Sequence, residues 1–117
     1  MAYRIGIAST DGLVVNQHFG RAESFLIADV DDDGQINVLE QRFLQPVCDG
    51  GNHDDDRLAE NINKLADCNY LLVSRIGPGA ESKLEERGIA AYEIPGIIEE
   101  SVHKLLAYVE IQNLLHG

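Results

Sequence analysis

The sequence has no tryptophan, and aromatic residues make up only 6% of its 117 residues. Hydrophobic residues nevertheless account for 44% of the chain. That fraction is enough for the single core of a chain of this length. We therefore expect residues 1–117 to form one domain with a mainly aliphatic core.

Long apolar runs and cysteines are also scarce. No run of about 18 apolar residues occurs, so no membrane-spanning helix is predicted. The N-terminal stretch MAYRIGIAST has one positive charge and no apolar core before a cleavage site, which favours a first strand over a signal peptide. Cys48 and Cys68 are too few for a disulfide scaffold, and they predict a reduced, cytoplasmic protein.

Basic residues are outnumbered by acidic ones. Nine lysines and arginines against twenty aspartates and glutamates give a formal charge of −11. Such a surface repels phosphate backbones, so nucleic acid is excluded as an expected partner. The charge is compatible with metal cations, or with solubility alone.

The hydrophobic pattern predicts alternating strands and helices. Residues 35–44 fit a strand through Ile36 and Val38, and a helix through Ile36, Leu39 and Phe43. Loops are expected at 10–23 and 45–53, where glycine, proline and polar residues gather. The remaining strands are expected at residues 3–9, 24–30, 70–74 and 89–94, and the helices from residue 54, within 75–88 and after residue 96.

The buried faces of two helices follow from their spacing. The first stripe is Leu58, Ile62, Leu65 and Ala66; the second is Ile98, Val102, Leu105, Leu106 and Val109. The order β, β, β, α, β, α, β, α predicts an antiparallel meander of three strands followed by parallel crossovers. The expected fold is α/β, with one mixed five-stranded sheet and three helices.

The segment DVDDDGQINVLE has the spacing of a calcium-binding EF-hand loop. Asp29, Asp31, Asp33 and Glu40 occupy ligand positions, and Gly34 occupies the sixth position. An EF-hand also needs a helix on each side, whereas residues 24–30 are better as a strand. Because Asp-Gly between apolar runs is a strong hairpin signal, we expect an acidic hairpin turn, with calcium binding as the alternative.

A second group of residues has the chemistry of metal ligands. His18, Cys48 and His53 all lie in predicted loops beside glycines. Imidazole and thiolate suit iron, zinc or an iron–sulfur cluster, although the spacing is not that of a closed zinc site. The two loops can meet at one end of the sheet. The alternatives are a loop histidine bonded to backbone, a half-buried cysteine and a histidine next to a helix cap.

Two arginines lie near these residues in the sequence or in the expected fold. Arg75 precedes two glycines between a strand and a helix, where backbone N–H groups can hold an anion. A plain strand-to-helix turn explains the same residues. Arg21 follows His18 closely, and a guanidinium there would offset the charge of an anionic ligand.

Signals for catalysis are weak. Ser9, Ser24 and Ser74 lack the context of a nucleophile elbow, and residues 54–56 are consecutive acids that point in different directions around a helix. A metal-dependent nuclease would need carboxylates on central strands, but the first strand has none. We therefore expect no enzymatic activity.

Three stretches together resemble the nitrogenase iron–molybdenum cofactor-binding family, which includes NifX, the core of NafY and the C-terminal region of NifB. They are VNQHFGRAESFLIADV, PVCDGGNHDDDRLAENINKLADCNYLLVSRIGPGA and LEERGIAAYEIPGIIEESVHKL. The resemblance covers nearly the whole chain. It implies a ribonuclease-H-like fold and a stand-alone cofactor-binding domain, without the radical-SAM domain of NifB or the extra N-terminal domain of NafY.

The resemblance also implies what is bound and by which residues. The cargo would be the iron–molybdenum cofactor or its iron–sulfur precursor, held transiently during nitrogenase maturation. His18 would be the leading ligand, followed by Cys48 and His53. Supporting contacts would come from Asn16, Arg21, Arg75, Gly50 and Gly51. Other cofactor-biosynthesis proteins or apo-dinitrogenase would be the partners.

Overall fold

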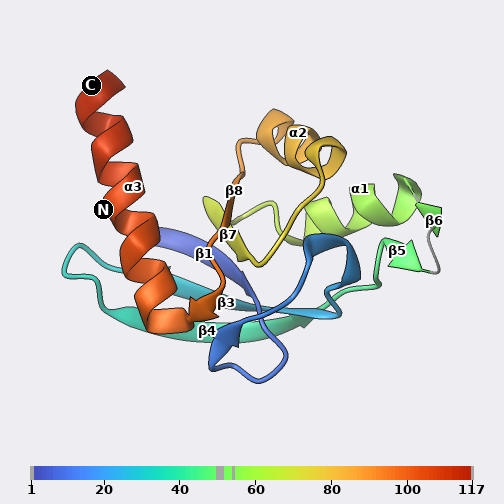
Figure 1. The fold of residues 1–117 in the computed structure, drawn as a ribbon, viewed down its shortest axis with the longest axis horizontal. Helices are drawn as coiled ribbons and strands as arrows, with labels where there is room; N and C mark the ends of the chain where they lie inside the picture. Colours follow the sequence, from blue (N-terminus) through green and yellow to red (C-terminus); the bar gives the residue numbers. More distant parts are fainter. Residues whose placement is uncertain (1, 50–51, 54, 117) are drawn as a thin grey trace.

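The computed structural model describes residues 2–49, 52–53 and 55–116. Its main sheet has the strand order β4-β3-β1-β7-β8 (Figure 1). β3 runs antiparallel to β1 and β4, whereas β7 runs parallel to β1 and β8. The strands are β1 (Tyr3–Ala8), β3 (Ser24–Val30), β4 (Ile36–Phe43), β7 (Tyr70–Val73) and β8 (Ala90–Glu93). The predicted meander with parallel crossovers is confirmed, while the ribonuclease-H-like label stays a prediction.

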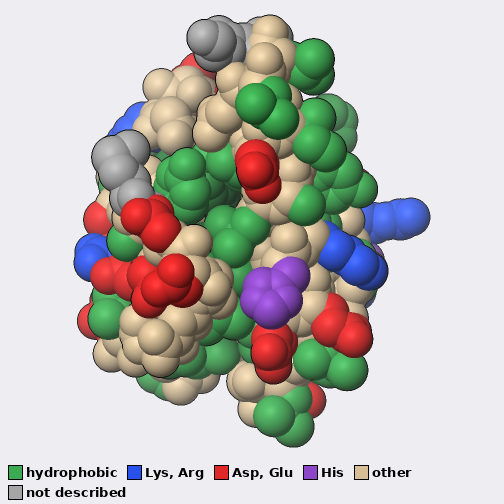
Figure 2. Space-filling model, turned by 90° about the vertical axis from the view of Figure 1, so that its left-hand side faces the viewer, with side chains coloured by type: hydrophobic (Ala, Val, Ile, Leu, Met, Phe, Trp, Pro, Cys, Tyr) green, Lys and Arg blue, Asp and Glu red, His purple; other side chains and the backbone are tan. Residues whose placement is uncertain are grey.

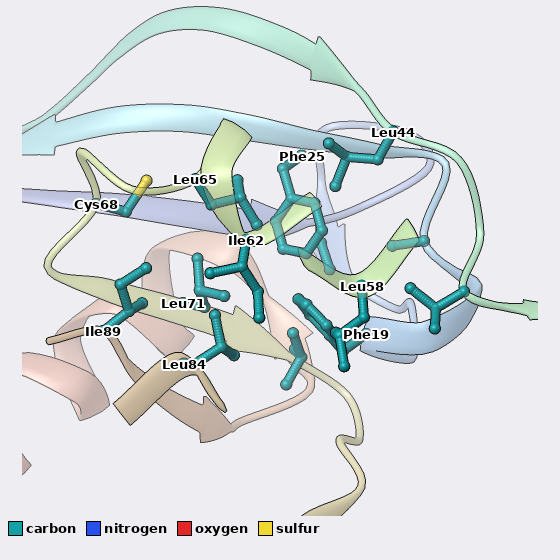
Figure 3. Close-up of a cluster of buried hydrophobic side chains, with 14 of the residues drawn as sticks. Phe19, Phe25, Leu44, Leu58, Ile62, Leu65, Cys68, Leu71, Leu84 and Ile89 are labelled. Atoms are coloured by element: carbon teal, nitrogen blue, oxygen red, sulfur yellow. The ribbon is translucent and has the colours of Figure 1, made fainter. Parts of the chain in front are cut away.

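In the described part of the chain, three α-helices accompany the sheet: α1 (Asp55–Lys64), α2 (Pro78–Glu86) and α3 (Ile98–His116). The helices α1 and α2 share one buried cluster with Phe25 and Leu71, which Figure 3 shows in close-up. Helix α3 contributes to a second cluster that includes Ile5 and Ile7. Because Ile5 and Ile7 alternate with residues facing the other cluster, β1 has a core on both of its faces.

The predicted stripe of the first helix is mostly confirmed. Leu58, Ile62 and Leu65 are buried, but Ala66 is exposed, so that part of the prediction is wrong. The reason is that α1 ends at Lys64 and the chain turns, which breaks the helical spacing. Asn61 is buried instead, and its Nδ2 donates to the carbonyl of Gln45 at 2.7 Å.

The predicted face of the last helix is confirmed. Val102, Leu105 and Val109 are buried, and Ile98 and Leu106 pack half-buried against the same cluster. The C-terminal part of α3 extends away from the sheet (Figure 1). Among the described residues, no helix is both long and apolar enough to cross a membrane.

The ambiguous segment 35–44 forms the edge strand β4. Its pairing with β3 shifts by one residue between Ile27, which faces Glu40, and Ala28, which faces Val38. Leu39 is therefore an extra residue, a β-bulge that bends this edge of the sheet. The bulge explains why both an alternating and a helical pattern could be found in the sequence.

Short elements lie inside segments that the sequence predicts as loops. β2 (Val14–Val15) pairs with β9 (Gly96–Ile97), which ties the loop after β1 to the start of α3. β5 (Cys48–Asp49) pairs with β6 (Asn52–His53). A single turn of 3₁₀-helix, η1 (Phe19–Arg21), follows His18. These elements give fixed positions to backbone that carries most of the predicted site.

Candidate functional site

The candidate site lies where the parallel strands β1 and β7 end. The loop after β1 runs back alongside the end of β7, and His18 forms a parallel backbone bridge with Arg75. The N–H of Ser74 donates to the carbonyl of Gln17 at 2.9 Å, and the N–H of Phe19 donates to the carbonyl of Arg75 at 2.8 Å. The carboxyl ends of parallel strands are the usual place for a ligand site in open α/β sheets.

Phe19 anchors the loop after β1 to the hydrophobic core. Its side chain is buried and meets Phe25 edge to face, with ring centroids 6.0 Å apart. The turn that follows is closed by the N–H of Arg21, which donates to the carbonyl of His18 at 3.1 Å. His18 and Arg21 are themselves exposed. A buried aromatic ring thus fixes a backbone that presents its polar side chains to solvent.

The exposed side chains surround a cavity of about 220 Å³. Its lining residues are His18, Gly20, Arg21, Arg75, Ile76 and Gly77. Neither Arg21 nor Arg75 forms an ion pair within the described part of the chain, whereas Arg4 and Arg42 are neutralised by nearby carboxylates. The cavity therefore brings together two arginines without described ion pairs on a protein whose formal charge is −11. Their positive charge favours an anionic ligand.

Acidic groups gather elsewhere. Figure 2 views the molecule from the side that carries α3, and acidic side chains lie there beside a histidine. Glu99 and Glu100 lie in the first turn of α3. The ring of His103 lies beside the acidic turn, since a Cβ added at Gly34 would be 3.7 Å from its Nε2. His103 thus lies among acids, whereas His18 lies among arginines.

A second cavity of about 500 Å³ adjoins the first. Gly20 and Gly77 line both of them. The other lining residues are Phe19, Val47, Asp55, Leu58, Pro78, Gly79, Ala80 and Lys83. The sequence analysis did not find this cavity. The available signal in the sequence was the segment Pro78-Gly79-Ala80, followed by Lys83 one helical turn later. This signal indicates a cavity only when α1 is known to lie opposite α2.

Glu93 is a further residue that the sequence analysis missed. Its Oε2 accepts a hydrogen bond from the N–H of Ile76 at 2.9 Å. It therefore holds the backbone just after Arg75, at the rim of the smaller cavity. Its position at the end of β8, beside the end of β7, was the available signal.

The predicted site residues are only partly brought together. Asn16 pairs with Thr10 instead: its Nδ2 donates to Thr10 Oγ1 at 2.8 Å, and its Oδ1 accepts from Thr10 N–H at 3.0 Å. These two hydrogen bonds brace the loop, and the contact of Asn16 with a ligand stays a prediction. Gly50 and Gly51 lie outside the described residues.

Cys48 and His53 face each other in the backbone pairing of β5 with β6. β5 lies against η1, so this hairpin is next to the turn that follows His18. The side chains of Cys48 and His53 are outside the described part, and their role as ligands stays a prediction. In the part of the chain that is described, no group of three His, Cys, Asp or Glu side chains could hold a metal ion.

The calcium-like segment is a hairpin turn. It connects β3 to β4, so strands stand where an EF-hand requires helices. Asp31 Oδ1 accepts hydrogen bonds from the N–H groups of Asp33 and Gln35, at 3.0 and 2.9 Å. Glu40 lies along β4 and pairs with Arg42. The hairpin prediction is confirmed, and the calcium alternative is not supported.

The fold and the site together define a small α/β domain with a cationic cavity at the ends of its parallel strands. The family model described as "Dinitrogenase iron-molybdenum cofactor" matches residues 1–108. The chain therefore belongs to this family of nitrogen-fixation and iron–molybdenum-cofactor biosynthesis domains.

Curated relatives agree with this assignment. The FeMo cofactor biosynthesis protein NifB of Chlorobaculum tepidum is 32% identical over 111 residues, which cover 95% of this chain and 26% of the relative. NifB of Frankia alni is 34% identical, covering 86% of this chain and 20% of the relative. Protein NifX of Sinorhizobium fredii is 35% identical, covering 65% of this chain and 49% of the relative. The chain thus spans about a quarter or less of these NifB relatives.

Two solved structures share the fold. The crystal structure of PH0822 has a TM-score of 0.61 at 22% identity, covering 89% of this chain and 90% of that one. The NMR structure of the Thermotoga protein TM1290 has a TM-score of 0.55 at 24% identity, covering 90% and 88%. Both extend over nearly the whole α/β domain.

Proposed function

We propose that this domain binds and carries the iron–molybdenum cofactor, or its iron–sulfur precursor, during nitrogenase cofactor biosynthesis. The observation that carries the proposal is the convergence of His18, Arg21 and Arg75 on one open cavity in a member of this family. Neutral imidazole is a natural ligand for an exposed iron, and two guanidinium groups complement an anionic cluster.

The arrangement suits a carrier. His18 supplies one ligand, and Cys48 or His53 supplies another from the hairpin whose strand β5 contacts η1. A cluster held by few protein bonds leaves more easily than one enclosed by four, and the cavity is open. No chemical step is required of the domain, so we assign it no enzymatic activity. Its partners are then the proteins that make the cluster and the apo-dinitrogenase that receives it.

An anaerobic titration with isolated cofactor tests the proposal. Wild type is compared with His18→Ala and with His103→Ala, which removes an exposed histidine from the acidic side of the molecule. We expect His18→Ala to weaken binding at least about tenfold, because a metal–ligand bond is lost, and His103→Ala to leave it unchanged. Equal affinities for the two variants would reject His18 as the ligand.

A further inference from the structure

The larger cavity next to the His18 cavity is an unassigned feature of this fold. It lies between the start of α1 and the start of α2, with Phe19 at its base. Its lining is mainly apolar: Phe19, Val47, Leu58, Pro78 and Ala80. A volume of about 500 Å³ is within the range of cavities that hold small organic molecules. The walls therefore suit a compact apolar body.

Two charged side chains border this apolar space. Lys83 of α2 and Asp55 of α1 are among the residues that line it. No ion pair joins them, and Lys83 has no ion-pair partner among the residues that the structure describes. Asp55 lies in the first turn of α1, where the helix dipole stabilises its negative charge. The positive charge of Lys83 is thus less well balanced by its surroundings than the negative charge of Asp55.

Positive groups next to this cavity also favour an anionic ligand. Arg21 and Arg75 lie around the adjoining cavity, and they too lack ion pairs with described residues. The N–H groups of Gly79 and Ala80, in the first turn of α2, have no intrahelical acceptors, and Gly77 provides no side-chain cap. Together, Lys83, the two arginines and these N–H groups outnumber the Asp55 carboxylate, which favours an anionic group at the polar end of the cavity.

We propose that this cavity is a binding site for a small organic acid with an apolar body, whose carboxylate pairs with Lys83. Because Gly20 and Gly77 line both cavities, such a ligand lies against the rim of the His18 cavity. Its presence changes what the smaller cavity can admit. The site does not depend on a metallocluster being bound, since every residue that forms it lies outside the set of proposed metal ligands.

Two probes of similar size and opposite charge test the proposal. The apo protein is titrated with phenylacetate and, separately, with phenethylamine, while amide shifts are followed by NMR. We expect phenylacetate to shift Phe19, Leu58, Ala80 and Lys83 saturably, with a Kd on the order of 1 mM, as is usual for a ligand of this size. We expect phenethylamine to bind at least about fivefold more weakly.

Matched variants test whether the charge of Lys83 is the one that binds the carboxylate. Lys83→Glu should weaken phenylacetate binding at least about fivefold and reverse the preference between the two probes. Lys104→Glu removes another lysine without a described ion pair, on α3, and should change neither affinity. His18→Ala should retain phenylacetate binding, which separates this site from the proposed cluster site.

Three results would overturn the proposal: no saturable shifts around the cavity, equal binding of the two probes to wild type, or equal weakening by Lys83→Glu and Lys104→Glu. A loss of cluster binding by His18→Ala, with phenylacetate binding intact, supports both sites independently.

Discussion

His18 is joined to Arg75 through the backbone, as neighbours in a parallel bridge between segments 57 positions apart in sequence. The adjacent hydrogen bond, from Phe19 N–H to the Arg75 carbonyl, is 2.8 Å long. Since main-chain atoms form the link, substitution of either side chain should leave the geometry of the cavity intact. The two side chains can therefore be tested separately from the fold.

Arg75→Glu is predicted to weaken binding of the isolated cofactor about tenfold at low salt. The change removes one positive charge and adds a negative one beside an anionic ligand. At about 0.7 kcal/mol for each solvent-exposed charge, the two together correspond to about a tenfold change in affinity. The difference from wild type should shrink as salt is raised, because exposed charges are screened. Anaerobic titrations at two ionic strengths measure this. Lys104→Glu is the control, and an equal loss there would mean that only net charge matters.

Gly6→Ala is predicted to destabilise the fold by about 1–3 kcal/mol, the usual range for overpacking a core. A Cβ at Gly6 would lie 2.7 Å from Cδ2 of Leu71, whose side chain is fully buried and cannot simply move aside. Gly79→Ala is the matched control, since no atom lies within 4 Å of its added Cβ. In helix α2 that change should stabilise by up to about 1 kcal/mol. Urea unfolding of both variants checks the sign of each effect.

Asp67→Asn is predicted to reduce stability by about 1 kcal/mol at neutral pH. Asp67 accepts hydrogen bonds from Arg42 Nη1 and Nη2, at 2.6 and 2.7 Å, and from Arg4 Nη1 at 3.0 Å. The Arg42 guanidinium holds the pKa of this carboxyl well below its usual range. Both partners are partly exposed, with 38% of the Asp67 side chain accessible. Because solvent screens such a pair, the predicted loss of stability is small.

The pH dependence follows from the direction of this pKa shift. A carboxyl with a lowered pKa in the folded state stabilises the protein above its unfolded pKa, about 3.9, and loses that contribution as the pH falls further. The difference between wild type and Asp67→Asn should thus be constant from pH 5 to 8 and shrink below about pH 4. Glu60→Gln, in the longer Glu60–Lys64 pair of 3.8 Å, should have little effect at any pH. A difference at pH 2 as large as the one at pH 7 would contradict this account.

Cys68 is predicted to be unreactive toward thiol reagents in the folded protein. Burial, together with the charge of Asp67, raises the pKa of its thiol to about 12, so almost no thiolate exists at pH 8. In a Cys48→Ser variant, a colorimetric disulfide reagent should label no thiol rapidly under native conditions and one thiol in 6 M guanidinium. Rapid labelling of the native variant would show that Cys68 is accessible.

Most of the sheet could be predicted because its signals are local. Residues 24–30 and 70–74 are short apolar runs, and a strand buried on both faces needs little else. Periodicity predicts Ala66 on the buried stripe, because the spacing of apolar residues does not reveal that the helix ends at Lys64. The bulge at Leu39 could not be predicted for a similar reason, because one extra residue in an edge strand does not change the composition of the segment.

Of the candidate site, only the polar residues could be predicted from the sequence. His18, Arg21 and Arg75 have side chains whose chemistry is visible in the sequence, and their meeting depends on β1 and β7 being adjacent and parallel. The hydrogen bonds between Asn16 and Thr10 could not be predicted, because the shape of the loop brings the two residues together. Lys83 was missed because a lysine on a polar helix is ordinary until an apolar cavity is found beside it.

Asp31→Ala is predicted to destabilise the protein by about 1 kcal/mol, because its carboxylate accepts two backbone hydrogen bonds that close the β3–β4 turn. Asp33→Ala removes the same charge from the same turn without a described side-chain hydrogen bond, so it should cost much less. Thermal unfolding of both variants gives the comparison. Millimolar calcium should leave the unfolding temperature of wild type unchanged, since no group of three His, Cys, Asp or Glu side chains among the described residues could hold a metal ion. A calcium-dependent rise that disappears in both variants would instead restore the turn as a cation site.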